Sequence, residues 1–269
     1  DGLEAEREQG VTIDVAYRFF ATARRKFIVA DTPGHEQYTC NMATGASTAD
    51  LAVVLVDARQ GVLQQTRRHS FIATQLGIRH VVLAVNKIDL VGYNEAVFER
   101  IVADYTTFAG DLGFATLVPI PISARFGDNI AMTSENTPWY RGPHLIDHLE
   151  TVEVGSDVKN RAFRFPVQYV NRPDPDFRGF AGTVASGSIT RGSTIVAAKS
   201  GKPSRVKRIV TYGGDLDHAV EGQAVTLVLE DEIEISRGDM LVAADQRPPV
   251  ADQFAANGIW FCEQPLVPG

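Results

Sequence analysis

Apolar segments of strand length alternate with longer mixed segments between residues 11 and 154, and this alternation limits the possible folds more than any other feature. Strands that alternate with helices are typical of α/β layering around a mostly parallel sheet. The strands are expected at residues 15–22, 26–30, 51–56, 81–85 and 117–122, and the helices at residues 64–76, 93–112 and 144–151. We therefore expect an α/β domain at residues 1–154.

Two of the expected strands, LAVVLV (51–56) and VVLAV (81–85), are apolar at consecutive positions instead of alternate ones. This pattern fits a strand that is buried on both faces because helices cover both sides of the sheet. We therefore expect both to be central strands of a doubly wound sheet.

The pattern changes after Lys159 to short alternating segments that are separated by glycine, such as FRFPVQYV and AVTLVLE. Short strands at such spacing are typical of a small closed antiparallel barrel. We expect a β-barrel domain at residues 161–248, joined to the first domain by the linker GSDVKN (155–160). Residues 249–269 are expected to begin a third barrel domain that this chain does not complete.

The charge of the chain argues against one class of function. Its 269 residues carry a formal net charge of −7, and the isoelectric point is near 5.4. A broad, charge-driven grip on nucleic acid needs a clustered basic surface. The adjacent Arg67 and Arg68 make no such patch and are expected on a solvated helix face. We therefore expect no nucleic-acid partner.

No apolar segment approaches the roughly 18 to 20 residues that are needed to cross a bilayer. The first residues, DGLEAEREQG, lack the basic and apolar parts of a secretory leader. The two cysteines, Cys40 and Cys262, fall in no metal-ligand spacing. These features predict a reduced, cytoplasmic protein with no membrane partner.

Three polar clusters each follow an apolar strand directly, where the loops of an open α/β sheet collect ligands. The first is DTPGH (31–35), the second is NKID (86–89), and the third is the pair Ser123 and Ala124. Each cluster alone is weak evidence, because DTPG is as easily a turn and NKID could start a helix on a surface loop. Three clusters in this order make a site for one phosphorylated ligand the better interpretation.

The first cluster has the residue types that a metal-bound triphosphate needs. Asp31 can hold Mg²⁺ through water, and the Gly34 N–H can meet a γ-phosphate. Thr32 and Pro33 lie between them and are also candidate residues of this nucleotide site. His35 would then lie beside the phosphate and could orient an attacking water, so it is the candidate catalytic residue.

The other two clusters suit a guanine base. Asp89 can accept two N–H groups from the guanine edge, Asn86 can brace the loop, and Lys87 can lie along the purine plane. The small residues Ser123 and Ala124 can let a backbone N–H approach the base oxygen.

The order DTPGH, NKID, SA resembles that of the translation-factor class of GTPases, and the upstream segment GLEAEREQGVTIDVAY resembles the switch segment of that class. The resemblance implies a fold of the P-loop GTPase type, GTP and Mg²⁺ as ligands, and a metal-binding role for Thr12 together with Asp31. Within the class, the chain looks most like the large, GTP-hydrolysing subunit of bacterial sulfate adenylyltransferase. The segments RFPVQYVNRP and DFRGFAGTVASG favour this family over the elongation factors.

This resemblance implies that GTP hydrolysis drives the adenylation of sulfate by ATP through a smaller catalytic subunit, which holds ATP and sulfate. The same module is fused to adenylylsulfate kinase in some bacteria, so a fused or associated kinase is a further expected partner. Two alternatives stay open: a translation factor that carries aminoacyl-tRNA, and a scaffold subunit that has lost nucleotide binding.

One element of the class is missing from this sequence. The phosphate-cradling loop GxxxxGK[ST] is absent, and in the related fold its strand lies in the middle of the sheet. We therefore expect a gap between the strand that ends at Ala30 and the strand that ends at Val56. We also expect the chain to be a fragment at both ends.

Two loops have two interpretations each. Trp139 and Tyr140 either close the first domain against its last helix or contact a partner subunit. Asp174, Asp176 and Arg178 form either a solvated turn or a contact to the catalytic partner.

Overall fold

The computed structural model describes residues 11–154, 161–174, 177–253, 255, 258–261 and 264. The chain divides into two compact units, one of residues 1–154 with 257–269 and the other of residues 155–256. The expected linker, 155–160, lies outside the described residues, and so does Cys262. The expectation of a third barrel that begins at residue 249 stays a prediction.

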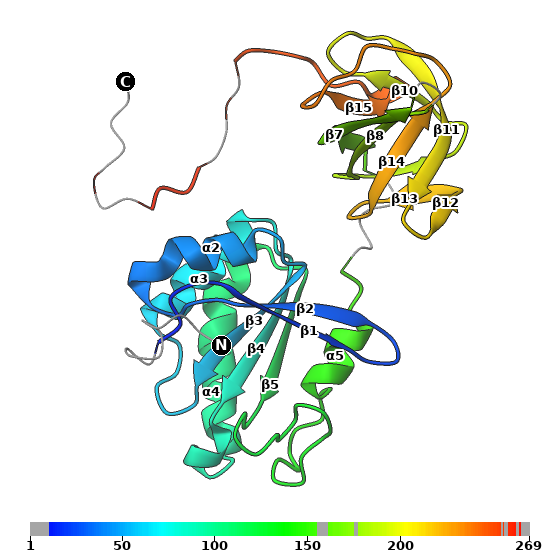
Figure 1. The fold of residues 1–269 in the computed structure, drawn as a ribbon. Helices are drawn as coiled ribbons and strands as arrows, with labels where there is room; N and C mark the ends of the chain where they lie inside the picture. Colours follow the sequence, from blue (N-terminus) through cyan, green and yellow to red (C-terminus); the bar gives the residue numbers. More distant parts are fainter. Residues whose placement is uncertain are drawn as a thin grey trace. The chain divides into compact units, whose positions relative to one another are not determined.

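A three-stranded parallel sheet forms the centre of the first unit (Figure 1). Its order is β3 (Leu51–Asp57), β4 (His80–Asn86) and β5 (Thr116–Pro121). Each strand agrees with an apolar segment of the sequence to within one residue at either end. The register pairs Asp57 with Asn86, so the last residues of β3 and β4 lie side by side.

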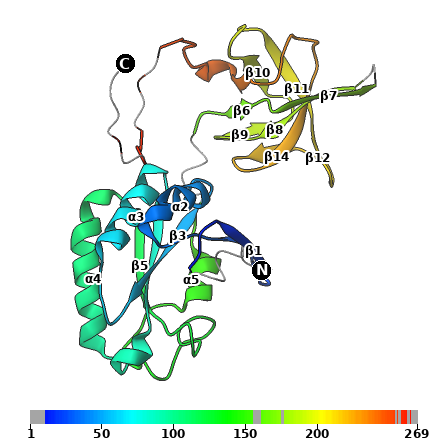
Figure 2. The same ribbon diagram turned by 60° about the vertical axis from the view of Figure 1, so that its left-hand side comes forward.

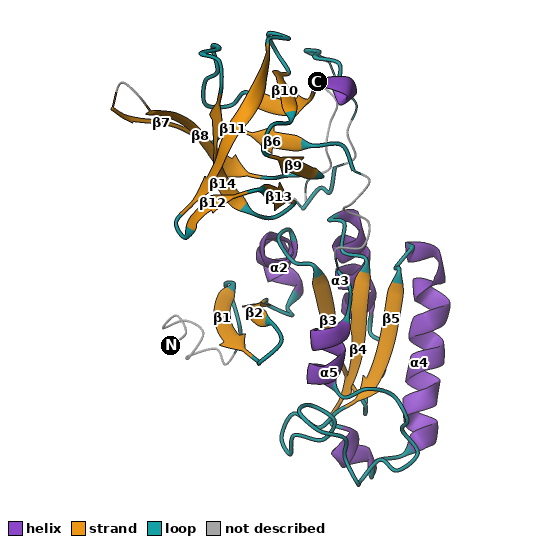
Figure 3. Ribbon diagram, turned by 90° about the vertical axis from the view of Figure 1, so that its right-hand side faces the viewer, coloured by secondary structure: helices purple, strands orange, loops and turns teal. Residues whose placement is uncertain are grey.

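Helices cover both faces of this sheet (Figure 3). On one face, Leu83 packs in a cluster with Ile101 and Tyr105 of α4 (Glu95–Ala109). On the other face, Val82 and Ile120 pack with Leu145 of α5 (Leu145–Thr151). The expected doubly wound α/β arrangement is therefore confirmed.

The other helices of this unit lie in the connections between strands. They are η1 (Glu36–Tyr38), α2 (Thr39–Ala46), α3 (Gln64–Gln75), η2 (Ile88–Val91) and η3 (Gly110–Leu112). The sequence analysis did not predict α2, whose eight residues include two threonines and a glycine, which are weak helix formers. Contacts of Met42 and Ala46 in α2 with Ile72 in α3 stabilise it instead.

The strands β1 (Ala16–Ala21) and β2 (Lys26–Asp31) form a separate antiparallel hairpin (Figure 3). Within residues 11–154, β2 pairs with β1 alone and β3 pairs with β4 alone. The expected gap is therefore present, and apolar side chains are exposed along it: Ile28 is 69% exposed and Leu55 is 60% exposed. The expectation of two central strands is right for β4 and wrong for β3, which has no second neighbour in this described range.

The second unit is an antiparallel barrel (Figure 2). Its main sheet has the order β6-β15-β10-β11-β14-β8-β7, and a bridge between Arg164 and Ser186 joins β6 to the segment after β8. The strands are β6 (Arg164–Pro166), β7 (Tyr169–Asp174), β8 (Phe177–Thr183), β9 (Ser188–Thr190), β10 (Thr194–Ala197), β11 (Pro203–Thr211), β12 (Gly214–Leu216), β13 (His218–Val220), β14 (Ala224–Leu229) and β15 (Met240–Ala243), followed by η5 (Ala244–Gln246). The expected β-barrel is confirmed.

Alternate residues of these strands fill the inside of the barrel. Phe165, Ile195, Ile209 and Leu227 are fully buried in one cluster. Gly182 of β8 allows a close approach of two backbone segments, because a Cβ atom there would clash with the carbonyl oxygen of Pro166. The alternation of inward apolar and outward polar residues, together with the close approach at Gly182, lets a small sheet close around its core.

Candidate functional site

The carboxyl-terminal edge of the parallel sheet brings two of the three polar clusters together. The Ala58 N–H, just after β3, donates to the carbonyl oxygen of Asn86 at 2.9 Å. The Ile88 N–H donates to the carbonyl oxygen of Ile122 at 3.2 Å, which ties the loop after β4 to the loop after β5. Parallel strands end at the same edge, so these loops form one continuous surface.

The side chain of Asn86 joins the second cluster to the third. Its Oδ1 accepts a hydrogen bond from the Lys87 N–H at 2.7 Å and another from the Ala124 N–H at 3.0 Å. Asn86 therefore braces both loops, as the sequence predicted for one of them. The Ala124 N–H, which was expected to approach the base oxygen, has Asn86 as its partner here, so its contact with a base stays a prediction.

The backbone of Lys87 and the ammonium group at the end of its side chain are both held in place. Its backbone is in the left-handed region, with φ 60° and ψ 33°, which is uncommon for a residue other than glycine. Its Nζ pairs with Oδ2 of Asp57 at 2.9 Å. The sequence analysis missed Asp57, although its place directly after an apolar strand is the same signal that identified Asp31 and Asn86.

The other members of the base clusters differ in exposure. Asp89 lies in η2 with a half-buried side chain, and no hydrogen bond or ion pair engages its carboxylate within the described part of the chain. Ser123 is fully buried, and its Oγ accepts from the Phe126 N–H at 3.4 Å. Asp89 is therefore available to a ligand, whereas Ser123 supports the loop.

The first cluster forms an open turn after β2. Pro33 is buried, Thr32 is half-buried, and Asp31, Gly34 and His35 are exposed. A Cβ atom at Gly34 would meet nothing within 4 Å, so the backbone there is accessible. Nothing in the described residues accepts or donates a hydrogen bond at the carboxylate of Asp31 or the ring of His35. These groups are free to meet a ligand.

The segment that contains Thr12 lies beside this turn. Asn41 of α2 donates through Nδ2 to the carbonyl oxygen of Ile13 at 2.7 Å. A Cβ atom at Gly45 would come within 2.6 Å of Thr32 and 3.2 Å of Val15, so both side chains pack over this glycine of α2. The helix α2 thus brings together the two segments that were expected to hold the metal.

Arg67 and Arg68 lie on the expected solvated helix face, since both belong to α3 and their side chains are 38% and 36% exposed; each also makes an ion pair. Arg68 pairs with Glu36, which follows the DTPGH turn directly. Arg67 pairs with Asp104 at 2.6 Å and lies over the ring of Phe108 at 5.0 Å. The two side chains diverge because neighbouring helix positions face different elements, and Arg68 fixes the turn against α3.

The structure leaves one expected association open. No hydrogen bond or ion pair joins residues 31–35 to residues 86–89 or 123–124 where the structure describes the chain. The same described residues contain no group of three or more His, Cys, Asp or Glu side chains that could hold a metal. This set still fits Mg²⁺, which keeps several waters and is usually bound by one or two carboxylates together with substrate phosphates. Thr12 and Asp31 remain its candidate ligands.

The loop of Trp139 and Tyr140 packs inside the first unit. Nε1 of Trp139 donates to the carbonyl oxygen of Tyr93 at 3.0 Å, and its ring lies 5.3 Å from that of Phe98. The carbonyl oxygens of Pro119 and Pro143 share the single O–H donor of Tyr140, at 3.1 and 3.0 Å, and burial raises the pKa of this hydroxyl to about 12. These contacts favour the interpretation that Trp139 and Tyr140 close the first unit over the interpretation that they contact a partner subunit.

The remaining uncertain groups have local roles. Arg178 lies in β8, over the ring of Phe180 at 5.3 Å, and donates to the carbonyl oxygen of Ile235 at 3.4 Å. Asp176 lies outside the described residues.

His144 caps α5 by accepting from the Asp147 N–H at 3.1 Å. Cys40 is an exposed free thiol. Among the described residues, none of the helices has the length and apolar character of a membrane-spanning segment.

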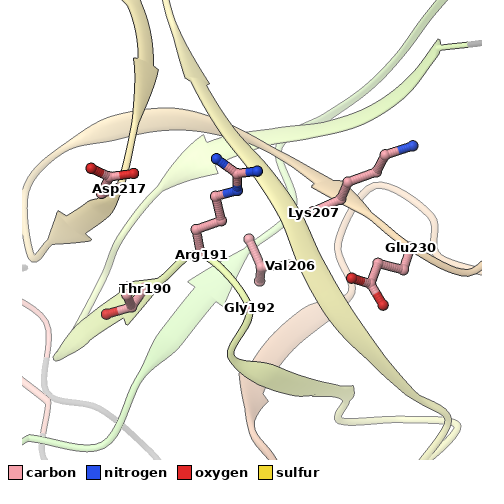
Figure 4. A pocket seen from close by; sticks show the side chains of 7 residues that line it. All are labelled: Thr190, Arg191, Gly192, Val206, Lys207, Asp217 and Glu230. Atoms are coloured by element: carbon pink, nitrogen blue, oxygen red, sulfur yellow. The ribbon is translucent and has the colours of Figure 1, made fainter.

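An open pocket of about 500 Å³ lies on the barrel, far from these clusters in sequence (Figure 4). Its lining mixes cationic and anionic side chains. It is lined by Thr190, Arg191, Gly192, Val206, Lys207, Asp217 and Glu230. Figure 4 shows Arg191 and Lys207 pointing in different directions instead of converging on one point. The pocket contains none of the predicted site residues.

Residues 1–176 match the family model described as "Elongation factor Tu GTP binding domain". Over its entire length the chain is 73% identical to "Bifunctional enzyme NodQ" of Rhizobium sp. (strain N33) and covers 42% of that protein. It is also 61% identical, again over its entire length, to "Sulfate adenylyltransferase subunit 1" of Cronobacter sakazakii and covers 57% of that protein. The chain thus spans less than two thirds of either relative.

Among solved structures, the chain resembles a crystal structure of the bacterial selenocysteine-specific elongation factor EF-Sec. The TM-score is 0.49 at 23% identity, and the match covers 90% of this chain and 40% of the other.

Proposed function

The chain belongs to the family of the elongation factor Tu GTP-binding domain, and from this premise we propose that it binds and hydrolyses GTP in order to drive sulfate activation. The observation that carries the nucleotide part is the junction at Asn86, because one side chain holds the loop of Lys87 and the loop of Ala124 together at the sheet edge. Ligands of open α/β sheets collect at such an edge.

At the base end, Asp89 accepts two N–H groups of guanine, and the Lys87 stem lies along the purine. At the phosphate end, Thr12 and Asp31 hold Mg²⁺, which offsets charge on the phosphate oxygens. The Gly34 N–H holds the γ-phosphate, and His35 orients the attacking water. Phosphoryl transfer depends mainly on such positioning and charge stabilisation.

The activity proposed for the whole protein follows from its relatives, one of which is named as a subunit of sulfate adenylyltransferase. GTP and water give GDP and phosphate, and this reaction drives ATP and sulfate to adenylyl sulfate and diphosphate on a smaller catalytic subunit. An adenylylsulfate kinase, fused or associated, is a further proposed partner. The segments around Thr12 and around Gly34 become ordered when GTP is bound and relax after hydrolysis. This change biases a lid or a domain angle of the partner subunit.

The base assignment is tested by Asp89→Asn in the full-length protein. We expect GTP affinity to fall and xanthosine triphosphate affinity to rise, because an amide replaces the acceptor of two hydrogen bonds worth about 1.5 to 3 kcal/mol each. Fluorescent-nucleotide competition measures both affinities. Equal GTP affinity in the variant would remove Asp89 from the site.

The catalytic assignment is tested by His35→Ala in the same protein. We expect nucleotide affinity to stay within twofold and hydrolysis to slow by about 10²- to 10⁴-fold, the range typical for a group that assists proton transfer or water attack. Phosphate release at saturating GTP measures the rate, and unchanged turnover would exclude His35.

The competing function is a translation factor that carries aminoacyl-tRNA. The net charge of −7 disfavours it. Filter binding to charged tRNA, with and without GTP, separates the two: tight GTP-dependent retention would favour the translation factor. Stimulation of adenylyl sulfate formation by GTP in the presence of the smaller subunit would favour sulfate activation.

A further inference from the structure

The carboxylate of Asp57 accepts hydrogen bonds from two cations beside the candidate base site. Its Oδ1 accepts from the backbone N–H and from Nε of Arg59, both at 3.0 Å. Its Oδ2 accepts from Nη2 of Arg59 at 2.6 Å and from Nζ of Lys87 at 2.9 Å. A carboxylate has about four acceptor sites, so all of them are used.

The sheet fixes the position of this carboxylate. Asp57 is the last residue of β3 and lies opposite Asn86, the last residue of β4. The Asp57 side chain is 15% exposed, whereas the Lys87 side chain is 47% exposed. The pair therefore joins a rigid anchor to a side chain that would otherwise extend into solvent.

Lys87 needs such an anchor because it carries a flexible four-carbon stem. Its backbone is already fixed by the left-handed conformation and by the hydrogen bond from its N–H to Asn86. The ion pair with Asp57 fixes the far end of the stem. The methylene groups between these two points then have few alternative rotamers.

We propose that Asp57 is a positioning residue for the nucleotide base: it holds the Lys87 stem in place as one wall of the guanine site. This inference rests on the proposed GTP binding. It adds a residue that touches no ligand and acts through Lys87. Since the effect lies at the base end, it applies equally to GDP and GTP, and it leaves the hydrolysis rate at saturating GTP unchanged.

A different role for Asp57 would be to anchor the turn after β3 through Arg59 alone. A double-mutant cycle in the full-length protein distinguishes the two roles. Asp57→Asn removes the charge and keeps the shape, and Lys87→Met keeps an apolar stem but cannot form the ion pair. Stopped-flow and equilibrium fluorescence with ribose-labelled GDP and GTP measure affinity, and phosphate release measures kcat.

We expect Asp57→Asn to weaken GDP and GTP binding by about two- to fivefold, as for removal of a partly exposed ion pair, with kcat unchanged. In the Lys87→Met background, Asp57→Asn should have no further effect on affinity. A matched control is Asp215→Asn, which breaks a similar two-bond pair with Arg208 (2.7 and 2.9 Å) on the barrel and should leave nucleotide affinity unchanged.

Two results would overturn the inference while leaving the proposed function intact. One is unchanged nucleotide affinity in Asp57→Asn, and the other is a full effect of Asp57→Asn in the Lys87→Met background. Wild-type protein that binds neither nucleotide would refute the proposed function and this inference with it. If Asp57→Asn unfolds below the assay temperature, Asp57→Glu replaces it, because this variant keeps the charge but moves it by one methylene. Wild-type nucleotide affinity in Asp57→Glu would also refute the inference that Asp57 positions the Lys87 stem.

Discussion

Replacing Asn86 with alanine removes the side-chain acceptor that bridges the loop of Lys87 and the loop of Ala124. The Lys87 N–H and the Ala124 N–H lose contacts of 2.7 and 3.0 Å. Both N–H groups lie near the surface and can regain water, so each lost hydrogen bond is expected to cost about 0.5 to 1 kcal/mol, toward the lower end of the usual range. The two together lower the unfolding free energy by about 1 to 2 kcal/mol.

This loss has two measurable consequences. The melting temperature of the first unit, followed by circular dichroism, should fall by about 2 to 8 °C, as expected for a unit of this size. The loops of Lys87 and Ala124 should exchange their amide hydrogens faster, as measured by mass spectrometry. In the full-length protein, GDP affinity should fall by about tenfold, since about 1.4 kcal/mol of loop ordering must then be supplied on binding.

The matched control is Asn94→Ala. Asn94 caps α4 in the same unit by accepting from the Val97 N–H at 3.1 Å, and loss of such a cap costs about 1 kcal/mol. It should therefore lower the melting temperature to a similar extent and leave GDP affinity unchanged. The reasoning is refuted if Asn86→Ala keeps wild-type loop exchange, or if both variants weaken GDP binding equally.

Three further predictions concern stability. Tyr105→Phe removes a buried 2.8 Å hydrogen bond with Ser70, whose hydroxyl keeps its bond to the Thr66 carbonyl. Urea unfolding should show a free energy of unfolding that is lower by about 0.5 to 1.5 kcal/mol. An unchanged value would mean that the hydrogen bond is not formed in solution. Gly182→Ala should lower the unfolding free energy of the barrel by about 1 to 3 kcal/mol, because its Cβ atom would clash with Pro166. In the control Gly213→Ala the new Cβ atom meets its nearest atom at 3.9 Å and should have little effect. Equal losses of unfolding free energy in the two variants would contradict the clash. Hydrogen bonds from Arg59 and then Lys87 hold the pKa of Asp57 well below its usual range. Its stabilising effect is therefore present above the unfolded pKa of about 3.9 and is lost as pH falls toward the folded pKa. The stability advantage over Asp57→Asn should be constant from about pH 7 to 5 and shrink below about pH 4, and a constant advantage down to pH 2 would contradict this.

The elements that the sequence predicted well are those with a strong local pattern. The apolar runs at 51–56 and 81–85 are strands β3 and β4 as predicted. For β4 the reason is burial, because five consecutive residues of the strand are covered on both faces. The polar clusters at 31–35 and 86–89 followed from their place at strand ends. The helix α2 was missed because contacts with α3, and not its own residues, stabilise it.

The sequence alone determined the α/β unit, the barrel and the loops that carry the candidate site, since each depends on the period and order of neighbouring residues. Only the tertiary structure decided that Asn86 spans two loops and that Asp57 holds the end of Lys87. These features depend on which strands lie side by side. Residues that are about 30 to 40 positions apart in the chain meet only when the sheet places their strand ends at one edge.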